Sequence, residues 1–223
     1  MSDEKRKILV ATTNPGKIAE LRAMLGTDLE WLSLADFGEM PEIVEDGATF
    51  AENARKKALG YAGATGVWTI ADDSGLVVDD LDGAPGVKSA RFSSEAVPAL
   101  GSKDKKQGQD ALATKTDRTL IDHRNITKVL ELLEGVPGEQ RTARFVCRLC
   151  LASPEKVLIE TEGTLEGLIT DREIGSEGFG YDPIFFVPHL NKTVAQLTRE
   201  EKNVISHRGN AIRKLKPLLD ELL

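Results

Sequence analysis

Short apolar runs alternate with amphipathic stretches along the chain, and their order predicts a mixed α/β fold. Residues 7–12, KILVAT, have the length and apolar content of a buried strand. The next apolar positions recur at helical spacing, at Ile18, Leu21 and Leu25. Asn14 and Pro15 precede them and are residue types favoured at the N-cap and at the first helical position. A second helix is expected over 49–62, because this segment opens with the capping-box sequence TFAE.

The second half of the chain predicts a β-hairpin between two helices. One helix is expected to end at Glu134, because a Gly-Val-Pro sequence follows it. Strands are expected over 142–152 and 156–162, with a Ser-Pro-Glu turn between them. The C-terminal helix should be kinked or interrupted at Pro217. Its apolar face consists of Ile212, Leu215, Leu218, Leu219 and Leu222.

Two adjacent carboxylates stand where one of the predicted strands stops. The apolar run VWTI is followed by one alanine, then by Asp72 and Asp73, then by a serine and a glycine. We expect this strand to end at Ala71 and a second short strand to cover 76–78. Buried carboxylates are costly without a compensating cation, and acids at the carboxyl end of a strand suit a site for Mg²⁺ or Mn²⁺. The alternative is an ordinary polar turn, and these residues alone favour neither interpretation.

Composition and charge narrow the classes of function. The 223 residues suffice for one large domain or for two lobes. The net charge of −7 argues against binding along a nucleic-acid backbone. Since the sequence shows neither a membrane-length apolar stretch nor a signal-peptide core, we expect a cytoplasmic protein that binds no membrane. Residues 94–117 are polar and poor in large apolar side chains, which predicts a mobile insertion.

The two cysteines form a Cys-x-x-Cys pair, Cys147 and Cys150, inside the alternating pattern of a predicted strand. Residues three apart in a strand face opposite sides of the sheet, and one such pair supplies only half of a zinc site. We therefore expect two core cysteines and neither a redox nor a zinc centre.

Two loops have the composition of a site for a phosphate-bearing, planar ligand. Residues 12–17, TTNPGK, join the first strand to the first helix, where backbone N–H groups and Lys17 could hold an anion. The Walker pattern is not met, because its first glycine is missing. The segment 177–183, EGFGYDP, flanks an aromatic residue with glycines, which lets a planar ligand approach. Each loop also has an ordinary structural explanation, as a helix start or as a loop whose aromatics fill the core.

Two groups of cations complete the candidate chemistry. Lys57 lies on the second predicted helix, shortly after Glu42 and Glu45, and Lys202 precedes the sequence Ser-His-Arg-Gly at 206–209. Solvated ion pairs on helix surfaces would explain the same residues without any function. No serine or cysteine stands out as a partnered nucleophile, so a catalytic triad has little support.

Taken together, these segments resemble the inosine triphosphate pyrophosphatase family. Members of that family hydrolyse non-standard purine nucleoside triphosphates to the monophosphate and pyrophosphate, with Mg²⁺. The resemblance covers most of the chain, from near Ile8 to beyond Ala211, and the segment 94–117 is longer than the connection usual there. The stretches that carry it, in family order, are TTNPGK, TFAENARKKA, ADDSGLVVDDLDGAPGVKSARFS, RFVC, GFGYDPIFFVP and LTREEKNVISHRGNA.

The resemblance implies roles for individual residues. Asp73 would be a metal ligand and the general base, Asp72 would assist it, and Lys17 would neutralise phosphate charge. Either Glu45 or Glu42 would complete a site for Mg²⁺ or Mn²⁺. The other residues implied to contact the nucleotide are Thr12, Thr13, Asn14, Pro15, Gly16, Lys57, Ser74, Phe179, Gly180, Tyr181, Asp182, Lys202, His207 and Arg208.

The expected fold is α/β, with a long mixed, partly antiparallel sheet that links two lobes and a nucleotide cleft between them. The order of strands and helices follows from the pattern, whereas the lobes, the cleft and a homodimer are implied by the resemblance. Two other functions would use the same segments: a nucleotide-binding sensor without turnover, and a metal-dependent phosphatase that releases orthophosphate. A sensor would not need both aspartates, and the released product distinguishes the two enzymes.

Overall fold

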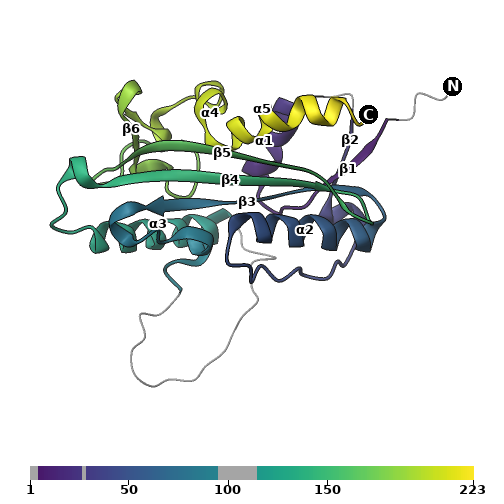
Figure 1. The fold of residues 1–223 in the computed structure, drawn as a ribbon. Helices are drawn as coiled ribbons and strands as arrows, with labels where there is room; N and C mark the ends of the chain where they lie inside the picture. The colour runs from purple at the N-terminus through teal and green to yellow at the C-terminus, as the bar shows by residue number, and fades with distance from the viewer. Residues whose placement is uncertain (1–4, 27–28, 95–114) are drawn as a thin grey trace, which may run out of the picture. The chain divides into compact units, whose positions relative to one another are not determined.

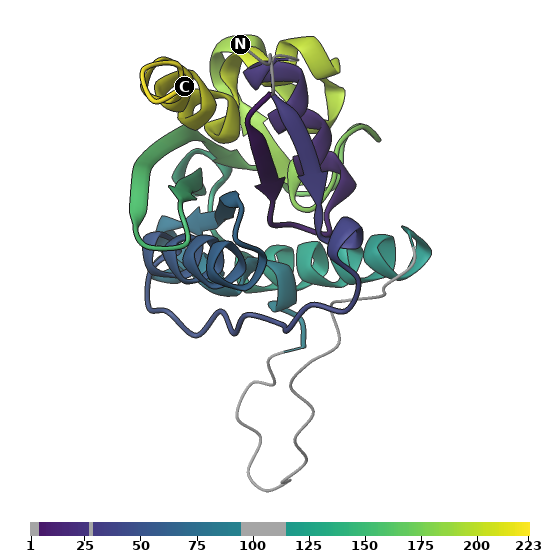
Figure 2. The same ribbon diagram turned by 90° about the vertical axis from the view of Figure 1, so that its right-hand side faces the viewer.

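A computed structural model of the chain describes residues 5–26, 29–94 and 115–223 (Figures 1 and 2). Seven strands form a sheet in the order β2-β1-β3-β4-β5-β6-β7. The strands are β1 (Lys7–Val10), β2 (Glu30–Ser33), β3 (Trp68–Val78), β4 (Thr142–Ala152), β5 (Val157–Ile169), β6 (Phe185–Val187) and β7 (Lys192–Thr193). The first strand is parallel to both of its neighbours, while β6 is antiparallel to β5 and to β7. The sheet is therefore mixed, which confirms the predicted α/β class.

Five α-helices accompany the sheet in the described part of the chain. They are α1 (Pro15–Leu25), α2 (Phe50–Thr65), α3 (Lys115–Leu132), α4 (Arg199–Ile205) and α5 (His207–Asp220). None of them combines the length and the hydropathy that a bilayer span requires. The chain divides into two compact units, of which the first comprises 1–74, 145–165 and 199–223 and the second 75–144 and 166–198. Strands β3, β4 and β5 contribute residues to both units.

In the first unit, helices cover both faces of the strands (Figure 1). Helices α1 and α5 pack on one face, where the core includes Val10, Leu149 and Leu215. Helix α2 packs on the other face, against a second core cluster. Cys147 belongs to the first cluster and Cys150 to the second, so the two sulfurs face opposite sides of β4. Both cysteines are buried, which confirms two core cysteines, and burial raises the pKa of each thiol to about 12.

The helix starts of the first unit follow the sequence signals. Asn14 caps α1, its Oδ1 accepting the N–H of Gly16 at 2.9 Å, and Pro15 is the first helical residue. Thr49 caps α2 through the N–H of Glu52 at 3.2 Å. All three assignments confirm predictions made from residue type and spacing.

The first turn of α5 lies directly on β5. Gly163 permits this approach, because a Cβ atom there would lie 2.1 Å from the carbonyl oxygen of His207 and 2.5 Å from the nitrogen of Ala211. Ser206 caps the helix by accepting the N–H of Gly209 at 3.0 Å. The close contact fixes the position at which α5 begins, and therefore where Arg208 points.

In the second unit, α3 packs against the short helix η3 (Gly86–Arg91). Asn125 of α3 is buried and joins the two, since it accepts the N–H of Ser93 at 2.7 Å and donates to the carbonyl of Ser89 at 3.3 Å. Within β3, Gly75 has no room for a side chain, because a Cβ atom would lie 2.2 Å from the hydroxyl oxygen of Ser89.

Several predicted boundaries were wrong. Strand β3 does not stop at Ala71 but continues through the two aspartates to Val78, so the acidic segment is strand and not turn. The predicted hairpin is present, closed by a bond from the Ser153 N–H to the Lys156 carbonyl at 2.9 Å, but β5 extends beyond the expected end, to Ile169.

Two other predictions concern helices. Helix α5 continues through Pro217 to Asp220, so it is not interrupted at the proline. Of the segment 94–117, residues 115–117 belong to α3, and Ser94 ends a turn. The rest of that segment lies outside the described residues, so the predicted insertion stays a prediction.

Candidate functional site

Asp72 is the centre of a buried cluster of charges in the first unit. Its Oδ2 lies 3.0 Å from the Nζ of Lys17, 3.1 Å from the Nη2 of Arg208 and 2.8 Å from the hydroxyl of Ser74. Burial opposes ionisation, yet Lys17 and Arg208 hold the pKa of Asp72 well below its usual range. This carboxylate is therefore ionised at any physiological pH, and it fixes cations from two helices.

Glu20 is the second acid of this cluster, and sequence reasoning missed it. The residue is buried on α1, its Oε2 accepts a bond from the Nη1 of Arg208 at 2.5 Å, and its Oε1 lies 3.7 Å from the Nζ of Lys202. The only sequence signal is its position one helical turn after Lys17. Arg208 thus spans two carboxylates, Glu20 and Asp72, and its pKa is raised despite burial.

Asp73 follows Asp72 directly, but its surroundings shift its pKa in the opposite direction. It faces α2, where its Oδ2 accepts the amide N–H of Asn53 at 3.0 Å. Burial raises the pKa of Asp73 to about 6, with a further contribution from Glu45, while Lys57 partly offsets both. Neighbouring carboxyl groups whose pKa values are driven apart are typical of sites in which one acid organises charge and the other exchanges a proton.

Glu45 is the acid that approaches Asp73, and Lys57 lies close to both. The Nζ of Lys57 lies 2.8 Å from the Oε2 of Glu45. Burial alone would lower the pKa of Lys57, but Glu45, Asp72 and Asp73 raise it. Glu42, the other predicted candidate for a metal ligand, is exposed to solvent. The interactions of Glu45 with Lys57 and Asp73, together with the exposure of Glu42, therefore favour Glu45 as the partner of Asp73.

The pair of Asp73 and Glu45 fits a small divalent cation. Mg²⁺ in proteins is commonly held by one or two carboxylates, with water and substrate phosphates as the other ligands. The described residues include no group of three or more His, Cys, Asp and Glu side chains that could hold a metal ion, so a cation at this pair would need its other ligands from water and substrate. A cation would also relieve the repulsion from Glu45, which adds to the effect of burial in raising the pKa of Asp73.

The segment 12–17 has less anion-binding capacity than the sequence suggested. The N–H groups of Gly16 and Lys17 both point at the Oδ1 of Asn14, at 2.9 and 3.4 Å, and the hydroxyl of Thr12 accepts the N–H of Asn14 at 3.1 Å. These groups are engaged by the cap itself. The ammonium group of Lys17 and the positive end of the helix dipole are the cationic features of this segment.

His207 is a neutral side chain of the first unit. Its ring stacks on Phe145 at a centroid distance of 4.9 Å, and its Nδ1 is buried without a hydrogen-bond partner among the described residues. Burial lowers the pKa of His207 well below its usual value, and the charge of Arg208 adds to the effect. His207 is consequently suited to a neutral hydrogen bond and not to the binding of phosphate as a cation.

In the second unit, two carboxylates hold the predicted aromatic loop. Asp182 accepts the N–H of Phe179 at 2.9 Å, and Asp122 of α3 accepts the N–H of Gly180 at 2.8 Å. The hydroxyl of Tyr181 donates to the carbonyl of Ser89 at 2.9 Å, which places this ring in the interior. Asp122 was missed by sequence reasoning, and a polar residue in an amphipathic helix gives no signal of such a contact.

The structure therefore gathers most of the predicted site residues in the first unit. Lys17, Asp72, Ser74 and Arg208 form one cluster, with Lys202 linked to it through Glu20, while Asp73, Glu45 and Lys57 form an adjacent one. The segment from Phe179 to Asp182 lies in the second unit.

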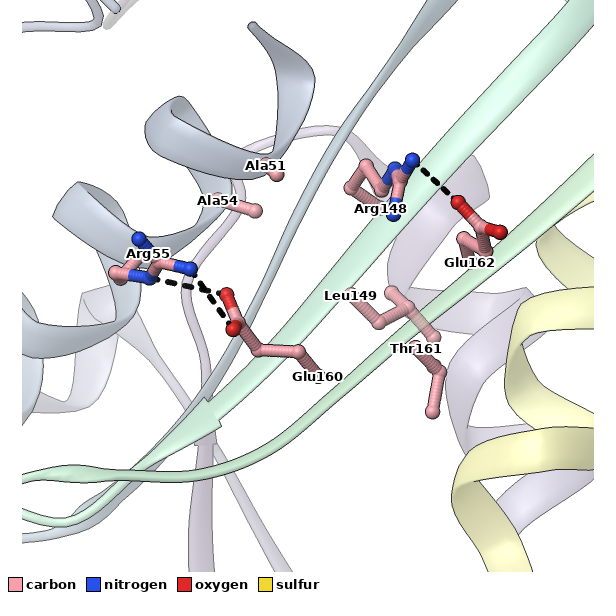
Figure 3. Close-up of a pocket in the computed structure, with 8 residues that line it drawn as sticks. All are labelled: Ala51, Ala54, Arg55, Arg148, Leu149, Glu160, Thr161 and Glu162. Carbon is pink, nitrogen blue, oxygen red and sulfur yellow. Dashed lines mark hydrogen bonds and ion pairs between the residues drawn. The ribbon is translucent and has the colours of Figure 1, made fainter.

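A separate hollow of about 350 Å³ lies in the first unit between α2, β4 and β5 (Figure 3). Arg55 of α2 binds Glu160 with two hydrogen bonds, of 3.1 and 2.9 Å, and Arg148 of β4 is paired with Glu162. None of the residues predicted from the sequence to be in the site lines this hollow. Since each guanidinium already has a carboxylate partner, the hollow is electrically balanced.

Comparison with known proteins places the chain in a family. The family model described as the Ham1 family matches residues 8–218. A protein named dITP/XTP pyrophosphatase from Exiguobacterium sibiricum is 46% identical over 220 residues, which cover 97% of this chain and 98% of that protein. One of the same name from Geobacter sulfurreducens is 46% identical over 211 residues, covering 94% of each chain.

Solved structures agree with these sequence matches. The Ham1 protein of Staphylococcus aureus is 36% identical, with a TM-score of 0.78 over 98% of this chain and all of that one. A structure described as a nucleoside-triphosphatase and dITP/XTP pyrophosphatase from Mycobacterium abscessus is 40% identical, with a TM-score of 0.69 over 95% of this chain and 99% of that one. By sequence over nearly its whole length and by fold, the chain belongs to the Ham1 family.

Proposed function

We propose that this protein hydrolyses the triphosphates of inosine, deoxyinosine and xanthosine to the monophosphate and pyrophosphate, and so removes non-standard purines from the nucleotide pool. The observation that carries the proposal is the contrast between Asp72 and Asp73. One is held ionised by Lys17 and Arg208, and the other has a pKa raised to about 6 beside Glu45. The names of the relatives, dITP/XTP pyrophosphatase, support the triphosphates of deoxyinosine and xanthosine as substrates.

In this mechanism Asp73 is the general base. Water attacks the α-phosphorus, a new phosphorus–oxygen bond forms, the bond to the bridging oxygen breaks, and pyrophosphate leaves. Asp73 accepts the proton that the attacking water loses. A Mg²⁺ or Mn²⁺ ion, which Asp73 and Glu45 would hold, supplies charge neutralisation at the phosphates. The neighbouring Asp72 assists by keeping Lys17 and Arg208 in place.

Three lysines provide the remaining positive charge for the phosphates. Lys17, Lys57 and Lys202 are each paired with a carboxylate, of Asp72, Glu45 and Glu20 respectively, and their side chains are mostly buried. That pairing fixes their ammonium groups before substrate arrives, which is how preorganised electrostatics lowers a barrier to phosphoryl transfer.

Identification of the released product is the decisive experiment. Inosine triphosphate is incubated with the protein and Mg²⁺, and the products are separated by ion-exchange chromatography. We expect inosine monophosphate and pyrophosphate in equal amounts. Release of orthophosphate would indicate a phosphatase, and tight nucleotide binding without any product would indicate a sensor; either result would overturn the proposal.

The proposal extends to assembly, cofactor and location. We expect a homodimer and strict dependence on Mg²⁺ or Mn²⁺, as the family resemblance implies, and a cytoplasmic enzyme, as the sequence pattern predicts. Light scattering during gel filtration measures the assembly, and activity after removal of divalent cations with a chelator measures the metal requirement.

Removal of the Asp122 carboxylate is expected to weaken substrate binding more than turnover. In Asp122→Ala the N–H of Gly180 loses its acceptor, and the loop that carries Phe179 loses one of its two carboxylate contacts. A hydrogen bond to a charged group contributes about 1.5–3 kcal/mol, so we expect KM for inosine triphosphate to rise about tenfold or more.

Asp122→Asn is the matched control, because its amide oxygen can still accept the N–H of Gly180. Steady-state kinetics of both variants checks the prediction. If the alanine variant keeps a normal KM, or if the asparagine variant is equally impaired, the hydrogen bond to Gly180 is not what matters.

A further inference from the structure

Asn53 lies between the two parts of the first unit that carry the acids of the proposed reaction. The residue is buried on α2, with only 1% of its surface exposed. Its Nδ2 donates to the Oδ2 of Asp73 at 3.0 Å, and its Oδ1 accepts the N–H of Gly47 at 2.7 Å. Gly47 belongs to the loop that also carries Glu45. One side chain therefore joins β3 to that loop.

The orientation of the Asn53 amide follows from its neighbours. The backbone N–H of Gly47 can only donate, so it must face the oxygen of the amide. The NH₂ group is then directed at Asp73 and supports its ionised form. The other oxygen of Asp73 accepts the N–H of Ser74 at 3.1 Å, so each carboxylate oxygen is fixed by one donor.

The packing around Gly47 makes this arrangement tight. A Cβ atom on Gly47 would lie 2.7 Å from the Oδ1 of Asn53 and 2.8 Å from the Cβ of Glu52. No L side chain fits there without displacing the amide or the helix. The loop with Glu45 thus approaches α2 as closely as its backbone allows, and Asn53 sets the distance.

We infer that Asn53 is a positioning residue, which holds Asp73 and the loop of Glu45 in the one arrangement that binds a divalent cation and aligns the base. The inference rests on the proposed function, because it takes Asp73 and Glu45 as the acids of the reaction. The role proposed for Asn53 is exerted through Asp73 and through the loop of Glu45, to both of which it is hydrogen-bonded. Groups of this kind typically contribute 10–100-fold to metal affinity or to activity.

Three variants test the inference. Asn53→Leu has a similar shape but can neither donate nor accept. Gly47→Ala keeps the Asn53 amide but displaces it from the loop side, and it changes no atom of Asp73. Arg55→Met is the control on the same helix: it removes the ion pair with Glu160, which faces the separate hollow (Figure 3) and lies outside the site.

Two measurements are made on each variant. The affinity for Mn²⁺ is determined by electron paramagnetic resonance of the free ion, without nucleotide, and kcat and KM are determined with inosine triphosphate. For Asn53→Leu we expect Mn²⁺ affinity and kcat each to fall at least tenfold, while KM changes less than threefold. Gly47→Ala should show both losses to a smaller extent, and Arg55→Met should match the wild type in both.

The possible results separate the inference from the proposed function. If the wild type releases no pyrophosphate but Asn53→Leu still loses Mn²⁺ affinity, the proposed function fails and the positioning role stands. If the wild type is active and Asn53→Leu keeps both Mn²⁺ affinity and kcat, the inference fails alone. Three other results would also overturn the inference. Gly47→Ala could keep the Mn²⁺ affinity and kcat of the wild type, or Arg55→Met could lose as much of both as Asn53→Leu does. The wild type could also bind no Mn²⁺.

Discussion

Asp73→Asn is expected to lower kcat for inosine triphosphate by about 10³-fold or more, which is within the range that positioned proton transfer contributes. The amide cannot accept a proton from water at neutral pH, and it is a poorer partner for Mg²⁺ than a carboxylate is. The bond to Asn53 can persist, because the amide oxygen of the new residue can accept it. Steady-state release of pyrophosphate from the purified variant measures the effect.

The same substitution should leave the fold intact and should not lower the free energy of unfolding. The pKa of Asp73 is raised from 3.8 to about 6, so the folded state holds this proton more tightly than the unfolded state does. Above pH 6 the ionised carboxylate therefore costs stability, up to about 3 kcal/mol in the absence of divalent cations. The neutral amide removes that cost.

The pH dependence provides a check on this reasoning. Without divalent cations, Asp73→Asn should be at least as stable as the wild type to urea at pH 8. The difference should shrink as the pH falls through 6 towards 4, because Asp73 then becomes protonated in the wild type. A variant that turns over inosine triphosphate at a normal rate, or one that is unfolded at pH 8, would contradict the role given to Asp73.

Arg208→Met is expected to be the most destabilising single substitution in the charge cluster. The side chains of Arg208, Asp72 and Glu20 have exposed fractions of 2%, 0% and 8%, so the guanidinium is the shared partner of two buried acids. Loss of one partner of a buried ion pair typically costs 3–5 kcal/mol, because the other charge stays buried without compensation. Lys17 remains close to Asp72, so we expect a loss of about 3 kcal/mol, measured by urea denaturation.

Two control variants identify the cause of that loss. Arg208→Lys keeps the charge but cannot bind both carboxylates with a planar fork, and should lose less stability than the methionine variant. Adding Glu20→Gln to Arg208→Met removes one of the two buried carboxylate charges that lost the guanidinium, and should recover part of the loss. A loss below 1 kcal/mol for the single variant, or no recovery in the double variant, would show that the cluster does not depend on Arg208.

The sequence predicted correctly the helix starts that depend only on residues close by in the chain. Asn14, Pro15 and Thr49 are helix starts because a cap forms within three or four residues. The apolar periodicity similarly identified α1 and α5, and the capping-box spacing identified α2. The turn predicted from Asp72 to Gly75 was wrong because the conformation there depends on residues distant in sequence. Asp, Ser and Gly favour turns locally, but Lys17 and Arg208, which are distant in sequence, compensate the charge and let the strand continue.

The sequence predicted those residues of the candidate site that residue type or a family motif identifies. Asp72, Asp73, Lys57 and Arg208 could be named from the sequence, and the structure brings the partners of each into contact. Glu20 could not be identified, because a glutamate in an amphipathic helix is ordinarily solvated and its burial depends on cations from α4 and α5. The function of Asn53 also requires a loop and a strand that only the tertiary fold brings together.

Asp72 and Asp73 lie in the middle of β3, so an insertion or deletion earlier in this strand would change the face of the sheet on which each acid lies. Successive residues of a strand face opposite sides, so the two acids reach α1 and α5 on one face and α2 on the other only in the present register. Deleting a single codon between Trp68 and Ala71 would deliver Asp73 to Lys17 and Arg208 and would move a serine into the place beside Asn53. We therefore expect β3 to tolerate substitutions far better than insertions or deletions, even where the protein stays folded.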